Sequence, residues 1–76
     1  MRKIDYWIEV DGDDTTGEQS FNIRSALSKA KKMAKQYEKE VWITKYRYDE
    51  SWGMIPADFG FPSYWIIKPN GEVEEH

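Results

Sequence analysis

The stretch NIRSALSKAKKMAKQYEKEVWITKYRYD, residues 22–49, decides the fold, because its hydrophobic period changes from that of a helix to that of a strand. Asn22 is a typical helix N-cap, and apolar residues then recur every three or four positions. This stripe predicts a helix to about Glu38–Glu40 and contains Ile23, Ala26, Leu27, Ala30, Met33, Ala34 and Tyr37. Over residues 41–49 the period becomes two, which predicts a strand directly after the helix.

The segments on either side of this stretch have strand and turn signals. Residues 3–10 alternate between apolar and polar and predict a half-buried strand, and 11–17 has turn chemistry. Residues 18–23 are either a short second strand that returns antiparallel or the approach to the helix, and we favour the strand. A further strand is expected at about 63–68, and Asn70-Gly71 is a strong hairpin turn before a terminal strand around 72–74.

These elements predict one α+β domain that spans residues 1–76. We expect two layers, in which one amphipathic helix packs on one face of an antiparallel sheet of three to five strands, in the order β-β-α-β-β with a short terminal hairpin. An aromatic loop that contains Gly and Pro is expected at about 50–62. With no cysteine, the fold must be held together by packing, to which four Trp, five Tyr and three Phe contribute.

One helix covers only one face of a sheet, so the other face needs an explanation. The aliphatic positions that should pack beneath the helix are Ile4, Ile8, Val10, Val41 and Ile43. The opposite face is expected to collect Trp7, Trp42, Tyr46 and Tyr48, with Trp65 or Tyr64 according to the register. Left bare, such a face would exceed the apolar patch that a typical monomer exposes.

The stretch SWGMIPADFGFPSYW, residues 51–65, offers two answers to this problem. Its loop could fold back over the aromatic face as a lid that acts as a second small core. Alternatively, the loop could anchor a partner, since Trp, Tyr and Met are enriched at interface centres and long loops are often functional. The predicted anchors are Trp52, Met54, Ile55, Phe59 and Phe61.

Charge divides the sequence into three blocks that the net charge of −3 conceals. Residues 1–18 have a net charge of −4, residues 19–48 of +6 and residues 49–76 of −5. Four basic residues fall within about 80° on a helical wheel at roughly 100° per residue, namely Arg24, Lys31, Lys35 and Lys39. They predict either a solvated surface balanced by the acidic hairpins or an electrostatic contact for phosphates or an acidic protein.

No recognised catalytic pattern is present. The single histidine, His76, is the last residue and is expected to fray, so Ser-His and Cys-His catalysis are set aside. Asp11, Asp13 and Thr15 have calcium-loop spacing, but Thr16 stands where such a loop needs Gly, so a solvated turn is preferred. We expect a non-enzymatic protein with no metal and no cofactor.

These features predict a small cytoplasmic protein that binds another protein. There is no apolar run at the start of the sequence and no membrane span is expected. The small, acidic, cysteine-free and aromatic-rich chain resembles, in style and size, the inhibitors that phages and mobile elements direct against host or defence enzymes. The alternative is a nucleic-acid-binding protein that uses the basic helix flank, the aromatic sheet face, or both. A third possibility is a homo-oligomer that buries the aromatic surface against its own copy.

Overall fold

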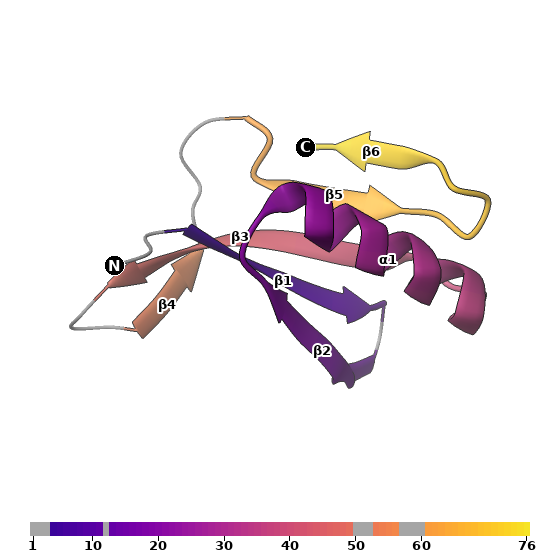
Figure 1. The fold of residues 1–76 in the computed structure, drawn as a ribbon, viewed down its shortest axis with the longest axis horizontal. Helices are drawn as coiled ribbons and strands as arrows, with labels where there is room; N and C mark the ends of the chain where they lie inside the picture. Colours follow the sequence, from indigo (N-terminus) through magenta and orange to yellow (C-terminus); the bar gives the residue numbers. More distant parts are fainter. Residues whose placement is uncertain (1–3, 12, 50–52, 57–60) are drawn as a thin grey trace.

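The computed structural model describes residues 4–11, 13–49, 53–56 and 61–76, with side chains described except at 13–16, 48–49 and 53–56. One helix packs against an antiparallel sheet, as Figure 1 shows. The elements are β1 (Ile4–Val10), β2 (Asp13–Ser20), α1 (Ile23–Tyr37), β3 (Val41–Asp49), β4 (Gly53–Pro56), β5 (Tyr64–Ile67) and β6 (Val73–Glu75). The two-layer α+β architecture that the sequence predicts is confirmed.

The sheet is organised around β3. Its continuous path runs β2-β1-β3-β5-β6, and β4 pairs with the part of β3 that β5 leaves unpaired. Residues Val41–Thr44 pair with β5, and residues Tyr46–Asp49 pair with β4, so two short strands share one edge of β3. The other edge of β3 pairs with β1 along its length, from Ile4 opposite Arg47 to Val10 opposite Val41.

Two segments form more strand than the sequence predicts. Residues 13–17, expected as a turn, belong to β2, and a register shift between Ile8 and Val10 accommodates the extra residues. Residues 53–56, expected as loop, form β4. Backbone pairing with an existing neighbour supplies the stability in both cases, and the local sequence does not.

The helix begins and ends at identifiable residues. The side-chain Oδ1 of Asn22 accepts a hydrogen bond from the backbone N–H of Ser25 at 2.8 Å, which confirms Asn22 as the N-cap. At the other end, Glu38 adopts the left-handed conformation, with φ 56° and ψ 38°, and ends the helix after Tyr37. The helix is therefore shorter than the expected limit of Glu38–Glu40.

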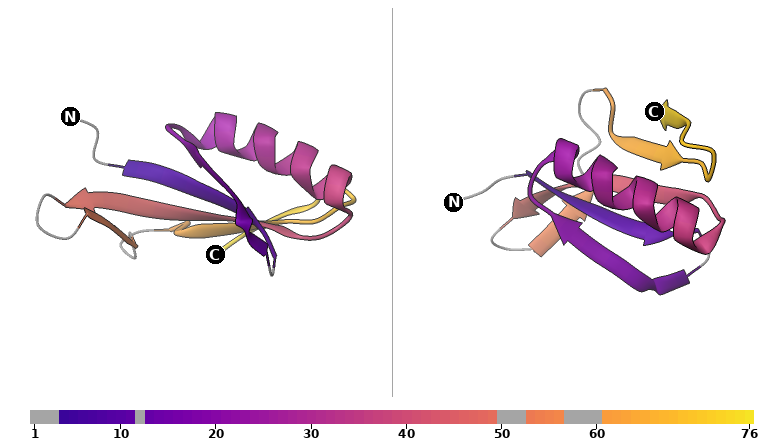
Figure 2. Two further views of the ribbon diagram at one scale, coloured as in Figure 1. Left: turned by 90° about the horizontal axis from the view of Figure 1, so that it is seen from below. Right: turned by 45° about the vertical axis from the view of Figure 1, so that its right-hand side comes forward.

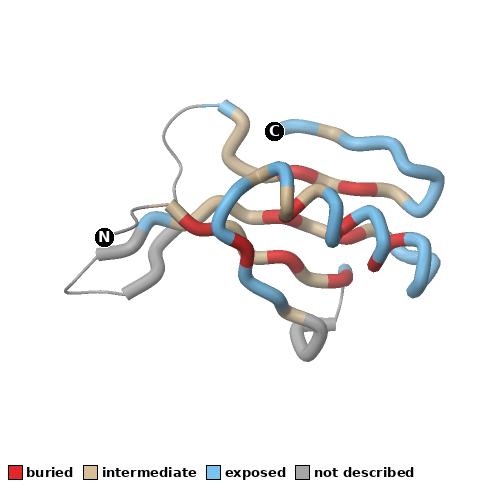
Figure 3. The backbone as a smooth tube through the Cα atoms, in the orientation of Figure 1, coloured by how far each residue is buried: buried red, intermediate tan, exposed pale blue. Residues whose placement is uncertain are grey.

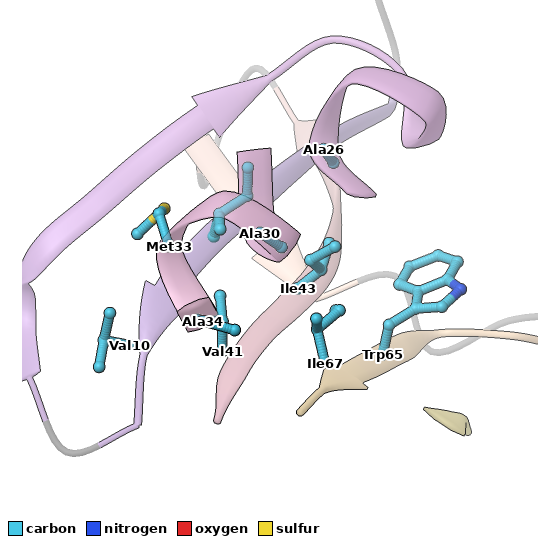
Figure 4. Packing of buried hydrophobic residues seen from close by; sticks show 10 residues of the cluster. Val10, Ala26, Ala30, Met33, Ala34, Val41, Ile43, Trp65 and Ile67 are labelled. Carbon is cyan, nitrogen blue, oxygen red and sulfur yellow. The ribbon is translucent and has the colours of Figure 1, made fainter. Parts of the chain in front are cut away.

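The core lies between α1 and the facing side of the sheet (Figures 3 and 4). Its fully buried aliphatic side chains come from three adjacent strands and are Ile8, Val10, Val41, Ile43 and Ile67. The helix contributes small residues and one flexible one, which are Ala26, Ala30, Met33 and Ala34. Burying one Val or Ile side chain contributes about 1.5–3 kcal/mol, so this cluster accounts for much of the stability of so small a chain. Ile4, predicted to join the core, is only half-buried.

The two faces of the sheet are unequal. Figure 2 shows, in its edge-on view, that the helix covers one face of the sheet, and the described residues form no second helix on the opposite face. We call this opposite side the helix-free face. No helix of the described residues is long and apolar enough to cross a membrane.

Candidate functional site: the helix-free face of the sheet

Strand register assigns each residue to a face, because paired residues point to the same side of the sheet and neighbours along a strand alternate. Ile43 pairs with Trp65 and lies in the core, so Trp65 belongs to the helix side and is 4% exposed. Thr44 pairs with Tyr64, which places Tyr64 on the helix-free face. The sequence left these two aromatic residues as alternatives, and the register decides between them.

A first row of the helix-free face crosses four strands. Glu9 in β1 pairs with Trp42 in β3, Trp42 pairs with Ile66 in β5, and Ile66 pairs with Glu74 in β6. An aromatic and an aliphatic residue are thus flanked by a carboxylate at each end. This alternation of acid, apolar and acid gives the row a negative border around an apolar centre.

A second row lies beside the first. Trp7 pairs with Gln19 on one side and with Thr44 on the other, and Thr44 pairs with Tyr64. His76 continues the row beyond β6, because its N–H donates to the Tyr64 carbonyl at 2.9 Å and its carbonyl accepts from the Tyr64 N–H at 3.2 Å. His76 is therefore held by backbone hydrogen bonds in the structure, where a frayed end was expected.

Three rings of these rows are stacked. The Trp42 and Tyr64 rings have centroids 5.6 Å apart at an interplanar angle of 8°, and the His76 ring lies 4.8 Å from Tyr64 at 7°. We call these residues the Trp42–Tyr64–His76 stack. The Trp42 indole N–H is enclosed and has no acceptor among the described residues. Ring stacking therefore holds Trp42 in place without a described hydrogen bond to its indole.

The predicted single aromatic face is only partly realised. Trp7 and Tyr46 do lie on the helix-free face by register, but within the described part of the chain the ring contacts of this face join only the stack. Trp7 lies instead against Gly17 of β2. The side chain of Tyr48 is outside the described residues.

Three described acidic residues, Asp5, Glu9 and Glu74, belong to the helix-free face by register. Asp5 pairs with Tyr46, is only 8% exposed and accepts a hydrogen bond from the Gln19 amide at 3.0 Å. At the other edge, the Lys68 ammonium lies 3.0 Å from Glu74 Oε2, and the His76 ring nitrogen lies 3.3 Å from Glu74 Oε1. Glu9, paired with Trp42, and Glu74, in contact with His76, therefore place two carboxylates beside the stack.

The electrostatic surroundings of Lys68 show how acidic this edge is. Its pKa is raised above the ordinary value, first by the hydrogen bond and charge of Glu74 and then by the charges of Glu72 and Glu40. Conversely, the pKa of Glu74 is lowered by its hydrogen bonds to Lys68 and then to His76. Several carboxylates therefore surround one ammonium group at this edge.

The predicted loop anchors are only partly described. Phe61 is 74% exposed, more than any other large hydrophobic residue in the described segments, and lies three positions before Tyr64. Met54 and Ile55 belong to β4 through backbone pairing with Tyr48 and Arg47. Trp52 and Phe59 lie outside the described residues, as does the proposed lid formed by their loop.

The predicted basic contact residues lie on the other side of the molecule. All four, Arg24, Lys31, Lys35 and Lys39, are exposed. They belong to α1 or to the turn after it, so these four basic residues lie on the helix side, whereas Glu9 and Glu74 lie on the helix-free face.

Neither a metal-binding group nor a similar protein identifies the role of this site. The described residues contain no group of three or more His, Cys, Asp or Glu side chains that could hold a metal ion. No protein-family model matches the sequence, and the searches of curated proteins and of solved structures find no match.

Proposed function

We propose that this chain is a small, non-enzymatic module of the cytoplasm that binds another protein through its helix-free face. The observation that carries the proposal is the Trp42–Tyr64–His76 stack bordered by Glu9 and Glu74. Stacked rings offer rigid apolar area, and the surrounding carboxylates select partners by charge. Phe61, three positions before β5 and exposed, is proposed as a further anchor.

The partner that this surface fits is a protein with a basic patch. Lys and Arg side chains pair with the carboxylates and also lie favourably over aromatic rings, at about 0.5–1 kcal/mol for an exposed cation–π contact. A protein that binds nucleic acid presents such a basic patch. This chemistry supports the finer proposal of a phage-type inhibitor that occupies the basic surface of a host or defence enzyme.

The position of the basic helix residues supports this proposal. Because residues 19–48 are basic, the protein cannot resemble the negative charge of DNA over its whole surface. Here, however, the helix carries the basic residues on the side away from the stack, so they do not neutralise the helix-free face. Stacking of nucleic-acid bases on this face is disfavoured, since the same carboxylates repel phosphates.

The test is affinity capture from host lysate after nuclease digestion, with three variants of the tagged protein. Glu9→Lys reverses the charge beside Trp42, Phe61→Ala removes an exposed anchor, and Lys29→Glu is the control on the helix. We expect wild type and Lys29→Glu to retain the same basic protein, and Glu9→Lys and Phe61→Ala to lose it. Equal retention by Glu9→Lys and wild type, or no retained protein at all, would refute the proposal.

The inhibitor version needs a second measurement. Once a retained enzyme is identified, its activity is assayed with increasing amounts of wild type and of Glu9→Lys. Inhibition by wild type alone supports the finer proposal. Binding without inhibition would leave a binding module and reject the inhibitor.

A further inference from the structure

The outward side of α1 carries only positive charge. Between Ile23 and Tyr37 the sequence has five basic residues and no acidic one, and all five basic side chains are exposed, namely Arg24, Lys29, Lys31, Lys32 and Lys35. Lys39, just after the helix, is exposed as well. Together these six residues form what we call the basic helix surface.

This arrangement is unfavourable for the isolated helix. Lys31 and Lys35 are four residues apart, and Lys32 is three residues from both Lys29 and Lys35, so like charges face one another. Each such pair destabilises a helix by about 0.2–0.5 kcal/mol. Exposed helices usually avoid this cost with interspersed Glu, and α1 has none.

The rest of the described fold does not neutralise this surface. The ion pairs among the described residues are those of Glu74 with Lys68 and His76, at the edge of the sheet. None of the six basic residues has an ion-pair partner within the described segments. The basic helix surface therefore presents five or more like charges that no ion pair of the described residues holds.

The composition of this surface favours phosphates over a protein partner. Its neighbouring exposed positions include Ser28, Gln36 and Glu38, and the exposed aromatic residues nearest to it in sequence, Phe21 and Tyr37, stand before the helix and at its last position. Lys is depleted at protein–protein interfaces, whereas Lys and Arg supply most contacts to nucleic-acid phosphates. From Arg24 to Lys35, eleven residues further along, the helix extends about 16 Å at 1.5 Å per residue. A duplex carries a charge for about every 1.7 Å of its axis.

We propose that the basic helix surface binds the phosphate backbone of double-stranded nucleic acid without sequence preference. The binding is electrostatic, because the surface lacks the Asn, Gln and Arg arrangement needed for bidentate reading of several bases. It does not depend on the proposed function of the helix-free face, since the two surfaces lie on opposite sides of the sheet. Both surfaces are therefore free to be occupied at the same time.

The test uses a fluorescently labelled duplex of about 20 base pairs of random sequence and a salt titration followed by anisotropy. Wild type should bind at about 50 mM salt, and the logarithm of its affinity should fall linearly with the logarithm of salt concentration. Lys31→Glu and Lys32→Glu should each weaken binding severalfold and reduce the slope by about 1. Lys31→Arg should bind like wild type.

The variants have built-in controls. Lys31→Glu replaces a repulsive pair with an attractive one, because the new carboxylate would lie four residues before Lys35, so this variant should fold at least as well as wild type. Arg47→Glu makes the same charge change at an exposed position of β3, where the backbone pairs with Ile4 and Ile55. We expect it to change affinity less than twofold.

Three outcomes would overturn the inference. The first is no binding by wild type at low salt. The second is an equal loss in Arg47→Glu and Lys31→Glu, which would show a general effect of net charge. The third is tighter binding of a single strand than of the duplex with no effect of Lys31→Glu, which would move the contact to the aromatic rings of the helix-free face.

Discussion

The indole ring of Trp7 lies directly over the backbone of Gly17. A methyl group added at Gly17 would lie within 2.7 Å of Trp7 Cε2 and Cη2, closer than real carbon contacts allow. Gly17 belongs to β2, two positions before Gln19, the residue that pairs with Trp7. Because glycine has no Cβ atom, Gly17 leaves room for the Trp7 ring. The ring in turn covers a backbone position of β2 that has no side chain of its own.

Gly17→Ala should displace Trp7 and destabilise the fold by about 1–3 kcal/mol, the usual cost of overpacking. Urea unfolding of Gly17→Ala, Trp7→Ala and the double variant would measure the effect as a double-mutant cycle. If the clash is the cause, alanine at position 17 costs much less when Trp7 is already absent. Equal costs in both backgrounds would contradict this explanation.

Asn22→Ala should lower the free energy of unfolding by about 1 kcal/mol, because the Ser25 N–H loses its side-chain acceptor. Asn22→Asp should retain the cap and gain from the helix dipole, since α1 has no acidic residue in its first turn. Chemical denaturation of the three proteins provides the comparison. An Ala variant as stable as wild type would show that the cap contributes little.

Glu38→Gly should stabilise the protein relative to Glu38→Ala by about 1 kcal/mol. Glu38 has a positive φ of 56°, a conformation in which a Cβ atom is strained and glycine is not. Glu38→Ala is the matched control, because it removes the charge but keeps the Cβ atom. Thermal unfolding of both variants tests this, and an alanine variant as stable as the glycine variant would argue against strain.

The Lys68–Glu74 contact should give a defined pH dependence. The pKa of Glu74 is lowered by Lys68, so the contact stabilises β6 above the ordinary Glu pKa and is lost as pH falls through the lower folded value. The pKa of Lys68 is raised, so the contact is also lost as pH rises through its folded value. The difference in thermal midpoint between wild type and Glu74→Gln should therefore be largest near neutral pH and shrink in acid and in strong base. A difference that is independent of pH would exclude the contact as its cause.

The period of the hydrophobic residues predicted β1, β3 and α1, because in these elements the local sequence pattern agrees with the tertiary packing. Ile8, Val10, Val41 and Ile43 alternate in sequence and are all buried beneath the helix, as expected. The stripe of α1 was likewise predicted, although Tyr37 at its end is 44% exposed. Each of these elements turns a single apolar side toward the core, so the sequence period alone identifies the buried residues.

The remaining features depend on pairing partners that a single sequence does not reveal. Gly53 and Pro56 indicate loop, yet β4 forms because β3 offers it an unpaired edge. Tyr64 and Trp65 are both aromatic, so only the register with β3 assigns them to opposite faces. His76 joins the stack through backbone bonds to Ser63 and Tyr64, 12 or more residues away.

The position of β3 has a consequence for how the molecule opens. Because β3 pairs with β1 on one edge and with β5 and β4 on the other, its backbone amides are enclosed from both sides, whereas β2 and β6 each have a single neighbour. Native-state hydrogen exchange should therefore find the slowest amides in β3, at the free energy of global unfolding, and faster local opening at β2 and β6. Such opening of β6 would unstack His76 from Tyr64 while the helix and its core remain closed, so the ring surface can be rearranged without unfolding the protein.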